Sequence, residues 1–398
     1  MRDQHSTLRG AGFLAAVCGL LIAAPGVHAQ DYTIIDLGTL DGPISGAYGL
    51  NNFGRVAGFS VTPTADYHGF YYDGTLSDIP PLAAQFQSHA FAVNAVDEVV
   101  AMSYDLGEMH THGLMWQGGA VTNLGNIAPR GLNDAGTVVG YVSVMETGFG
   151  WVDHAALWQA GTLFDLGTLG GHFSYVYAVD NTDRAVGMSL TANDTTPKAA
   201  LWQTGVWHDL GTLGGNKSQA YDINDAGAVV GVADTAAGMP HAFLFTIDAG
   251  GNVTSRTDLG ALGGDNSCAY AVNADGVVVG SSNDRAFRWE GGTLTDLNTL
   301  LPSGSDWELR QAWAINERGD MAGAGLHFGQ PRAYLLKPPC PGDFNGDGVI
   351  DLSDLAQLLG HYGMTSGAQY QDGDFDGDGD VDLSDLAALL SVYGMPCP

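Results

Sequence analysis

Basic residues are scarce in this 398-residue chain, which has 14 Lys and Arg against 44 Asp and Glu and a formal net charge of −30. A charge of this sign repels nucleic acid and anionic membrane surfaces, so we expect neither as a partner. Cysteine is also rare, at four residues. Gly reaches 58 residues while the helix formers Lys and Glu are few, which indicates turns and short strands.

Long apolar runs are missing after the first thirty residues or so. The one such run, residues 11–24, follows Arg2 and Arg9 and precedes small residues at Val27–Ala29. It is short for a bilayer span and has the flanks of a secretory signal peptide, although a buried N-terminal helix is an alternative. We therefore expect residues 1–29 to be a signal peptide and the mature protein to be secreted, extracellular or at the cell surface.

The cysteines fit an oxidising compartment. Cys18 lies in the expected signal peptide, whereas Cys340 and Cys397 flank an acidic C-terminal segment. We expect these two to form a disulfide around that segment. Cys268 is then a small core residue or a free thiol.

Residues 30–338 contain three patterns that each occur seven times at a spacing of about 43 residues, a period found in propeller blades. The pattern Asn-x-x-Gly-x-Val-Val-Gly, or a degenerate form of it, begins at Asn51, Asn94, Asn133, Asp180, Asn224, Asn273 and Asn316. The pattern Asp-Leu-Gly, or a near relative, begins at Asp36, Asp78, Asn123, Asp165, Asp209, Asp258 and Asp296. A basic residue opens an apolar strand at His68, His112, His154, Lys198, His241, Arg285 and Arg332.

One copy, from His154 to Met188, contains four short strand-like stretches joined in pairs by turns rich in Gly, Asn and Asp. Four strands repeated seven times predict a mostly β fold, a seven-bladed β-propeller. Tyr32–Asp36 lacks a hairpin partner, and so does Arg332–Leu336. Pairing these two ends would complete one blade and close the ring. An open β-solenoid is the alternative.

Loops of variable length lie at the blade end opposite the tight turns, and we expect ligands to bind there. Candidate ligand residues in these loops are Trp151, Asp153, Asn193, Asp194, Lys217 and Asp234. The tryptophans that recur at one strand position are expected to pack within blades; they are Trp116, Trp158, Trp202 and Trp289.

The seven basic residues are expected to form ion pairs within nearly every blade. If Ala160-Gly161 is a hairpin turn, Ala156 faces Asp165, and His154 lies diagonal to Asp165 on the same sheet face. A cationic rim that binds acidic polysaccharide is the alternative.

The repeat patterns resemble those of the extracellular HAF-repeat family, named for a tripeptide that stands here as His241-Ala242-Phe243. The resemblance covers most of residues 32–336. It rests on the motif Asp-Leu-Gly-Thr-Leu-Gly-Gly, as in Asp165–Gly171 and Asp209–Gly215. It implies a secreted protein and brings no established chemistry.

Residues 339–398 contain eleven Asp and no Glu, Lys or Arg. Two copies of a calcium-loop pattern place oxygen donors at positions 1, 3, 5, 9 and 12, a backbone carbonyl at 7 and Gly at 6. The expected donors are Asp343, Asn345, Asp347, Val349, Asp351 and Asp354 in the first copy, and Asp374, Asp376, Asp378, Asp380, Asp382 and Asp385 in the second. Carboxylates this dense repel one another unless a dication neutralises them, so we expect two bound Ca²⁺ ions. A disordered acidic tail is the alternative.

Each loop leads into an expected helix, Leu355–Gly363 and Leu386–Gly394, without an entering helix. This duplicated loop–helix unit, with Asp at position 12, resembles a type I dockerin over Pro341–Gly394. The resemblance implies calcium-dependent docking onto a cohesin-type receptor. The residues at the dockerin recognition positions are Leu352, Ser353, Leu383 and Ser384. The helices lack the Lys and Arg usual in cellulosomal dockerins, which leaves another surface receptor open.

The leading hypothesis is a non-enzymatic secreted binding protein, with the propeller as a recognition scaffold and the C-terminal module as a docking unit. A dockerin-bearing polysaccharide hydrolase or lyase is the alternative, and its catalysis would need convergent acid–base groups. The available carboxylates are Glu108, Glu146, Asp153 and Asp194. No catalytic signature stands outside the repeat, so we favour binding; a structural matrix protein is a third possibility.

Overall fold

The computed structural model describes residues 32–83, 86–105, 111–192, 196–345, 348–395 and 397. These residues form two compact units, 32–340 and 341–397. The larger unit is built of strands, whereas the smaller one contains two short α-helices. Within the described ranges, no helix combines the length and the apolarity needed to cross a membrane. The expected signal peptide, residues 1–29, lies outside the described residues.

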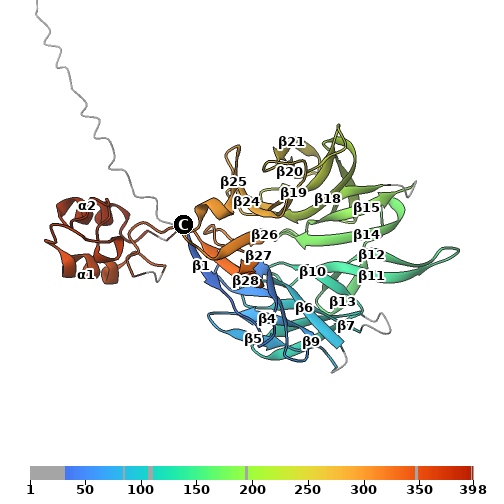
Figure 1. Ribbon diagram of the computed structural model, residues 1–398. Coiled ribbons are helices and arrows are strands. Elements are labelled where there is room, and N and C mark those ends of the chain that lie inside the picture. Colours follow the sequence, from blue (N-terminus) through green and yellow to red (C-terminus); the bar gives the residue numbers. More distant parts are fainter. Residues whose placement is uncertain are drawn as a thin grey trace, which may run out of the picture. The chain divides into compact units, whose positions relative to one another are not determined.

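The larger unit is a seven-bladed β-propeller, as predicted: seven antiparallel four-stranded sheets follow one another around a ring (Figure 1). Blades 1 to 3 contain β2 (Ser45–Leu50), β3 (Val56–Val61), β4 (Tyr67–Tyr72) and β5 (Leu76–Ile79); β6 (Phe86–Val93), β7 (Val99–Asp105), β8 (Thr111–Gln117) and β9 (Ala120–Gly125); and β10 (Ala128–Leu132), β11 (Val138–Glu146), β12 (Gly150–Gln159) and β13 (Thr162–Asp165). Blades 4 and 5 contain β14 (Gly170–Val179), β15 (Ala185–Thr191), β16 (Pro197–Gln203) and β17 (Val206–Gly211); and β18 (Gly214–Ile223), β19 (Ala228–Thr235), β20 (Pro240–Ile247) and β21 (Val253–Gly260). Blades 6 and 7 contain β22 (Ser267–Val272), β23 (Val278–Ser282), β24 (Arg285–Glu290) and β25 (Thr293–Asp296), followed by the 3₁₀ turn η1 (Leu297–Leu300); and β26 (Trp307–Ile315), β27 (Met321–His327), β28 (Gln330–Lys337) and β1 (Thr33–Asp36).

The sequence repeat and the structural blade differ by half a unit. In the copy that starts at His154, the first two strands, β12 and β13, complete blade 3, while the next two, β14 and β15, open blade 4. The repeat pattern gives the strands and their order, but hydrophobic periodicity alone does not tell which strand lies nearest the axis. Each repeat therefore bridges two blades.

The two ends of the propeller chain close the ring. Strand β1 pairs antiparallel with β28, with Thr33 opposite Lys337 and Asp36 opposite Tyr334. Blade 7 thus takes three strands from the C-terminal side of the unit and one from the N-terminal side, which confirms the predicted pairing. An open solenoid would leave both strand edges unpaired, and it is excluded.

Each inner strand turns into its neighbour through the Asn-x-x-Gly pattern. In blade 1, the backbone N–H of Asn51 donates to the Arg55 carbonyl and that of Gly54 donates to the Asn51 carbonyl, and the other six blades repeat this geometry. The fourth residue of each turn has a positive φ: Gly fills it in five blades, and Asp97 and Asp183 fill it in two. Gly and Asp are the residues that adopt this conformation at low cost, so the pattern follows from the turn.

The side chains of the six turn asparagines form a belt of hydrogen bonds around the propeller. The Asn51 Nδ2 donates to the Asn94 carbonyl at 2.8 Å, and the Asn316 Nδ2 donates to the Asn51 carbonyl at 3.1 Å, which joins blade 7 to blade 1. The remaining amide donors, each bonded to the turn carbonyl of the next blade, are Asn94, Asn133, Asn224 and Asn273. The belt therefore ties neighbouring blades together at their tight-turn ends.

Asp180 interrupts the belt because a carboxylate has no N–H to donate, and Arg184 supplies the missing donors. Its Nη2 reaches the Asn224 carbonyl at 3.4 Å and the Asp225 carbonyl at 2.9 Å, while its Nε pairs with the Asp180 carboxylate at 2.5 Å. The side chain of Asp180 is fully buried and that of Arg184 is 9% exposed. The buried pair thus takes the place of one asparagine.

The Asp-Leu-Gly pattern also has a structural cause. The Asp165 Oδ1 accepts the N–H of Gly167 at 2.8 Å, and the same bond forms at Asp36, Asn123, Asp209 and Asp258. The buried Ser174 hydroxyl donates to the Gly167 carbonyl. The same hydroxyl oxygen accepts the N–H of Ala155. This serine links β12 of blade 3 to β14 of blade 4.

The smaller unit contains two copies of a loop followed by a helix, α1 (Leu352–His361) and α2 (Leu383–Val392), with a 3₁₀ turn, η2 (Tyr370–Asp372), between them. The copies pair reciprocally: the N–H of Gly363 donates to the Val381 carbonyl, and that of Gly394 donates to the Ile350 carbonyl. Its buried apolar side chains include Phe344, Ile350, Leu358, Phe375, Val381 and Leu389.

Both helices begin three residues earlier than the sequence analysis predicted. Asp351 caps α1 by accepting the N–H of Ser353, and Asp382 caps α2 by accepting the N–H of Ser384. Carboxylates at loop position 9 therefore act as N-caps, a role that Asp fills well. The prediction had assigned these residues to the loop alone.

Candidate functional sites

The predicted pairs between basic and acidic residues form in four blades. His68 contacts Asp78 at 2.9 Å, and the other three pairs are His154–Asp165, His241–Asp258 and Arg285–Asp296. The predicted register, with Ala156 opposite Asp165, is confirmed. In blade 7, Asp36 pairs with His327 rather than with Arg332. Lys198 donates instead to the Asn216 carbonyl and Arg332 to the Pro43 carbonyl, so loop backbone competes for these two cations.

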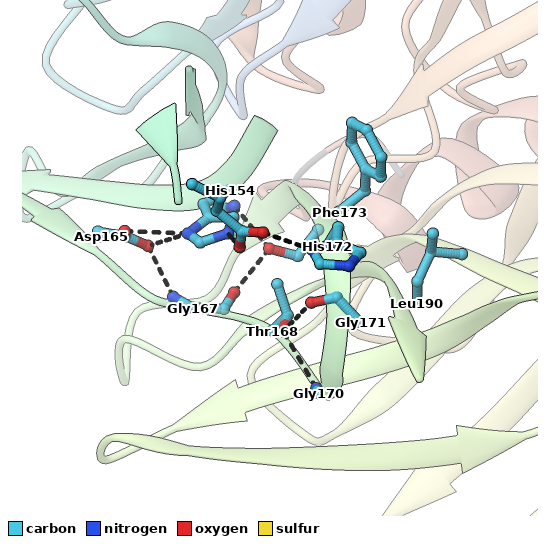
Figure 2. Close-up of polar contacts among 12 residues, drawn as sticks. His154, Asp165, Gly167, Thr168, Gly170, Gly171, His172, Phe173 and Leu190 are labelled. Carbon is cyan, nitrogen blue, oxygen red and sulfur yellow. Dashed lines mark hydrogen bonds and ion pairs between the residues drawn. The ribbon is translucent and has the colours of Figure 1, made fainter. Parts of the chain in front are cut away.

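On blades 3 and 4, one of these pairs extends into a chain of four side chains. Figure 2 shows His154 beside Asp165, with His172 on the other side of His154. The two nitrogens of His154 contact Asp165 at 3.0 Å and Glu146 at 3.2 Å, and the second oxygen of Glu146 contacts His172. The Phe149 ring stacks on His172 at a centroid distance of 3.8 Å. The long β11–β12 hairpin is thereby fixed to the start of β14.

Glu146, which joins the two histidines, does not have the properties of a catalytic acid. Its hydrogen bonds to His172 and His154 hold the pKa of Glu146 below its ordinary value, despite the opposing effect of burial. A glycosidase needs one carboxyl group with a raised pKa to protonate the leaving group. Glu146 is therefore better described as an ionised partner of two histidines than as a proton donor.

The other predicted ligand residues that the structure describes lie on blades 3 and 5. Trp151 is 69% exposed on β12, and Asp153 beside it accepts the hydroxyls of Ser143 and Tyr175. On blade 5, the carboxylate of Asp234 accepts the backbone N–H of Lys217. Three candidates lie outside the described residues; they are Glu108, Asn193 and Asp194.

The four recurring tryptophans lie in or against hydrophobic clusters of the blades, as predicted. Trp116 is buried in the cluster that joins blades 1 and 2. Trp158, Trp202 and Trp289 pack against clusters between later blades. Their main role is packing.

The sequence analysis missed a ring of side chains that lines a cavity at the centre of the propeller. Each inner strand contributes the residue three positions before its turn Asn or Asp. These residues are Tyr48, Phe91, Arg130, Tyr177, Tyr221, Tyr270 and Trp313. All seven are half-buried, and they surround a cavity of about 220 Å³. The only sequence signal for this ring is the constant spacing from the turn residue. The residue type at this position varies, because six blades supply Tyr, Phe or Trp and one supplies Arg130.

Stacking joins most of this aromatic ring. Tyr48 contacts Trp313 at a centroid distance of 4.7 Å and Phe91 at 5.4 Å. Tyr221 contacts Tyr177 at 5.3 Å and Tyr270 at 5.8 Å. Such ring contacts hold the side chains in place.

Asp222 is the one carboxylate among the described residues that line this cavity. Its Oδ1 accepts the N–H of Ile223 and its Oδ2 that of Val272, both at 2.9 Å. Burial is the main cause that raises the pKa of Asp222 to about 7, against the lowering effect of these two bonds. The surroundings of Asp222 in the cavity wall therefore favour its protonated carboxyl group.

The raised pKa predicts a pH dependence of stability. The folded protein holds the Asp222 proton up to about pH 7, whereas the unfolded chain releases it near the ordinary Asp value of 3.8. Stability therefore falls as pH rises between these values and levels off above pH 7. We expect Asp222→Asn to remove this component, measured as the difference in urea midpoint between the two proteins from pH 4 to 8. A constant difference over that range would contradict the prediction.

The second loop of the C-terminal unit brings its predicted calcium-binding carboxylates together. Oxygens of Asp374, Asp376 and Asp378 lie within 4.8 Å of one another, as do those of Asp380, Asp382 and Asp385. In the first loop, Asp343 accepts the N–H of Gly348 as Asp374 accepts that of Gly379 in the second. Asp347 lies outside the described residues, while Asn345, Val349, Asp351 and Asp354 belong to the described part of the first loop.

The electrostatics of the second loop fit a dication. Burial and then the charge of Asp385 raise the pKa of Asp376, and burial and then the charge of Asp378 raise that of Asp380. The Asp380 Oδ1 is buried and has no hydrogen-bond partner among the described residues. Gly379, with φ 90°, takes the sharp turn at position 6. These residues would hold a calcium ion, which would neutralise the crowded charge.

The predicted docking residues lie on the surface of the same unit. Leu352 and Leu383 are each 67% exposed at the first position of their helices, and Ser353 and Ser384 beside them are exposed. Two large apolar side chains are thus exposed at equivalent positions of the two copies. Cys340 and Cys397 are both disulfide-bonded, and Cys268 is a free thiol.

No protein-family model matches the chain, and no curated protein matches its sequence. Solved structures with a similar shape include virginiamycin B lyase from Staphylococcus aureus, with 11% identity, a TM-score of 0.44, and coverage of 78% of this chain and all of that one. The WD40 β-propeller domain of Doa1 has 15% identity and a TM-score of 0.39, covering 76% of this chain and 97% of that one. TolB from Acinetobacter baumannii has 10% identity and a TM-score of 0.42, covering 72% and 63%. Likenesses at this level assign no activity to the chain.

Proposed function

We propose that the chain is a secreted calcium-binding protein, in which the propeller is an extracellular recognition scaffold and the C-terminal unit docks onto a receptor. One observation carries the proposal: in the described part of the C-terminal unit, the second loop gathers six carboxylates in two clusters, and each of the two loops leads into a helix whose first residue is an exposed leucine. Oxygen-rich loops of this spacing suit Ca²⁺. The paired leucines suit a protein partner.

Calcium supports this role through the order it gives to the loops. Asp354 and Asp385 are fully buried, and each accepts three backbone N–H groups of its own loop, so each loop closes around its last residue. The remaining carboxylates repel one another and favour an ion between them. Calcium binding would thereby fix both helices and their exposed leucines in place.

The proposal extends the resemblances in the sequence. Likeness to HAF-repeat proteins and the signal-like residues 1–29 favour secretion, and likeness to type I dockerins favours a cohesin-like or other surface receptor. The propeller then presents its longer loops, such as the β11–β12 hairpin, to an extracellular polysaccharide or protein. The lowered pKa of Glu146 gives no support to a hydrolase or lyase.

Calcium titration of the chelator-treated mature protein tests the proposal. We expect two ions to bind per chain, with a gain in far-ultraviolet helical signal that chelator reverses. Asp378→Asn, in the second loop, is expected to leave one tight site, whereas Asp265→Asn, at an exposed position of the propeller, is expected to leave two. Isothermal titration calorimetry gives the stoichiometry.

A second arm tests docking itself. Binding to immobilised type I cohesins is measured with and without calcium, for the parent protein and for Leu352→Asp/Leu383→Asp. Calcium-dependent capture that the double variant loses would support docking through the helices. Fewer than one bound ion per chain at millimolar calcium would end the calcium role, and the propeller would then have to be explained separately.

A further inference from the structure

One of the residues that line the central cavity is a cation, Arg130, on the inner strand of blade 3. Its side chain makes no hydrogen bond or ion pair with any residue that the structure describes. Its guanidinium lies 4.2 Å from the ring centroid of Phe91 and 5.6 Å from that of Tyr141. Stacking holds such a group in position and leaves its N–H donors free for a ligand. In a chain with 14 basic residues among 398, an unpaired one at the axis is notable.

Two phenols near Arg130 are also free to donate. The hydroxyls of Tyr48 and Tyr177 have no hydrogen-bond partner among the described residues, unlike those of Tyr221 and Tyr270, which contact Gln219 and Ser281. Burial raises the pKa of both Tyr48 and Tyr177, and Arg130 is close enough to oppose that rise in each. One cation and two hydroxyl donors therefore face the same part of the cavity.

We infer that this cavity binds a small anion that carries a carboxylate on a six-membered ring, with Arg130 as the anion receptor. The fork of a guanidinium matches a carboxylate through two parallel hydrogen bonds. The aromatic side chains that line the cavity, among them Tyr270 and Trp313, suit the ring of the ligand. A uronic acid unit of an acidic saccharide and an aromatic acid share this chemistry. The inference rests on the recognition role proposed for the propeller and names its ligand class.

Charge also indicates the direction of entry. At the tight-turn end, the mouth of the cavity is lined by five carboxyl groups, with no cationic side chain among the described lining residues; they are Asp134, Asp180, Asp222, Asp225 and Glu317. That mouth repels an anion, so the ligand enters from the opposite end, where the longer loops lie. Asp222 also lines the cavity, and its Oδ2 accepts the N–H of Val272 in blade 6.

Calorimetric titration of the mature protein with glucuronate and with benzoate tests the inference and separates the two sources. Glucose and benzamide serve as uncharged counterparts, and sodium sulfate tests for any small anion. We expect one of the two acids to bind at least tenfold more tightly than its counterpart. Arg130→Gln should weaken that binding by about tenfold to a hundredfold, the range for a hydrogen bond to a charged group. Arg285→Gln removes an equal charge from an outer strand and should have no effect.

Tyr48→Phe and Tyr177→Phe keep the aromatic ring and remove one hydroxyl each, so they provide a test should Arg130→Gln misfold. Each is expected to weaken binding several-fold. Equal affinity for acid and neutral counterpart, or unchanged binding by Arg130→Gln and both Phe variants, would overturn the inference. If the protein binds other glycans on an array while these variants bind as the parent does, the recognition role stands and only this site is wrong. If neither the acids nor any glycan binds, both fail.

Discussion

Arg184→Ala is expected to lower the free energy of unfolding of the propeller by about 3–5 kcal/mol, the cost of leaving one member of a buried ion pair without its partner. The carboxylate of Asp180 is fully buried, and Arg184 is its only cationic contact among the described residues. The substitution also removes the hydrogen bonds to the carbonyls of Asn224 and Asp225 that join blade 4 to blade 5. The shift of the urea midpoint, followed by tryptophan fluorescence, measures the effect.

The arrangement in the neighbouring blade suggests a second substitution that restores the lost stability. In blade 5, Asn224 has Ala228 four residues later, and its amide donates to the Asn273 carbonyl without help from an arginine. Asp180→Asn/Arg184→Ala copies that arrangement into blade 4 and is expected to recover most of the lost stability. Arg310→Ala, which breaks an exposed pair with Glu308, should cost under about 1 kcal/mol. A double variant no more stable than Arg184→Ala would show that the amide belt does not bear on stability.

Asp385→Ala is expected to unfold the second loop–helix copy and to remove one of two calcium ions. The side chain is fully buried; its Oδ1 accepts the N–H groups of Phe375 and Asp376, and its Oδ2 accepts that of Asp382. Loss of the carboxylate leaves three backbone donors unpaired, one buried and two part-buried, and the buried one alone costs about 1–3 kcal/mol in a small unit. The far-ultraviolet signal and the calcium stoichiometry measure the outcome.

Asp385→Asn separates the two roles of this residue. The amide keeps one acceptor oxygen but loses the charge, so folding should suffer less than calcium affinity. Asp354→Ala, the equivalent change in the first copy, should give a matched loss there. An Asp385→Ala protein with parental helicity and two bound ions would refute the assignment of position 12.

The repeat spacing predicted the number of blades and the closing strands because each landmark has a local cause. The positive φ at Gly54 and its equivalents and the bond from Asp165 to Gly167 both lie within a few residues, so they leave a fixed pattern in the sequence. The belt could not be predicted in this way. The Asn51 amide meets the Asn94 carbonyl 43 residues away, and nothing local to either residue indicates the contact.

The candidate sites show the same division. The carboxylates of the second acidic loop lie close together because the loop is contiguous in sequence. The central cavity instead takes one residue from each of seven strands, and the residue types differ, as Arg130 and Trp313 illustrate. The ion pairs on the blades lie between these cases. The hairpin turn predicted their register. It did not predict that Arg332 and Lys198 would donate instead to the carbonyls of Pro43 and Asn216.

The union of β1 with β28 has a consequence for how the molecule is made. Thr33 meets Lys337, so the first strand to be synthesised waits for a partner made about 300 residues later, a contact of very high sequence separation. Until then blades 1 to 6 form an arc with two unsatisfied edges, which invite pairing with other nascent chains. We therefore expect the pairing of β1 with β28, which closes the ring, to be a late and slow step of folding. A chain truncated before β28 cannot form this pairing.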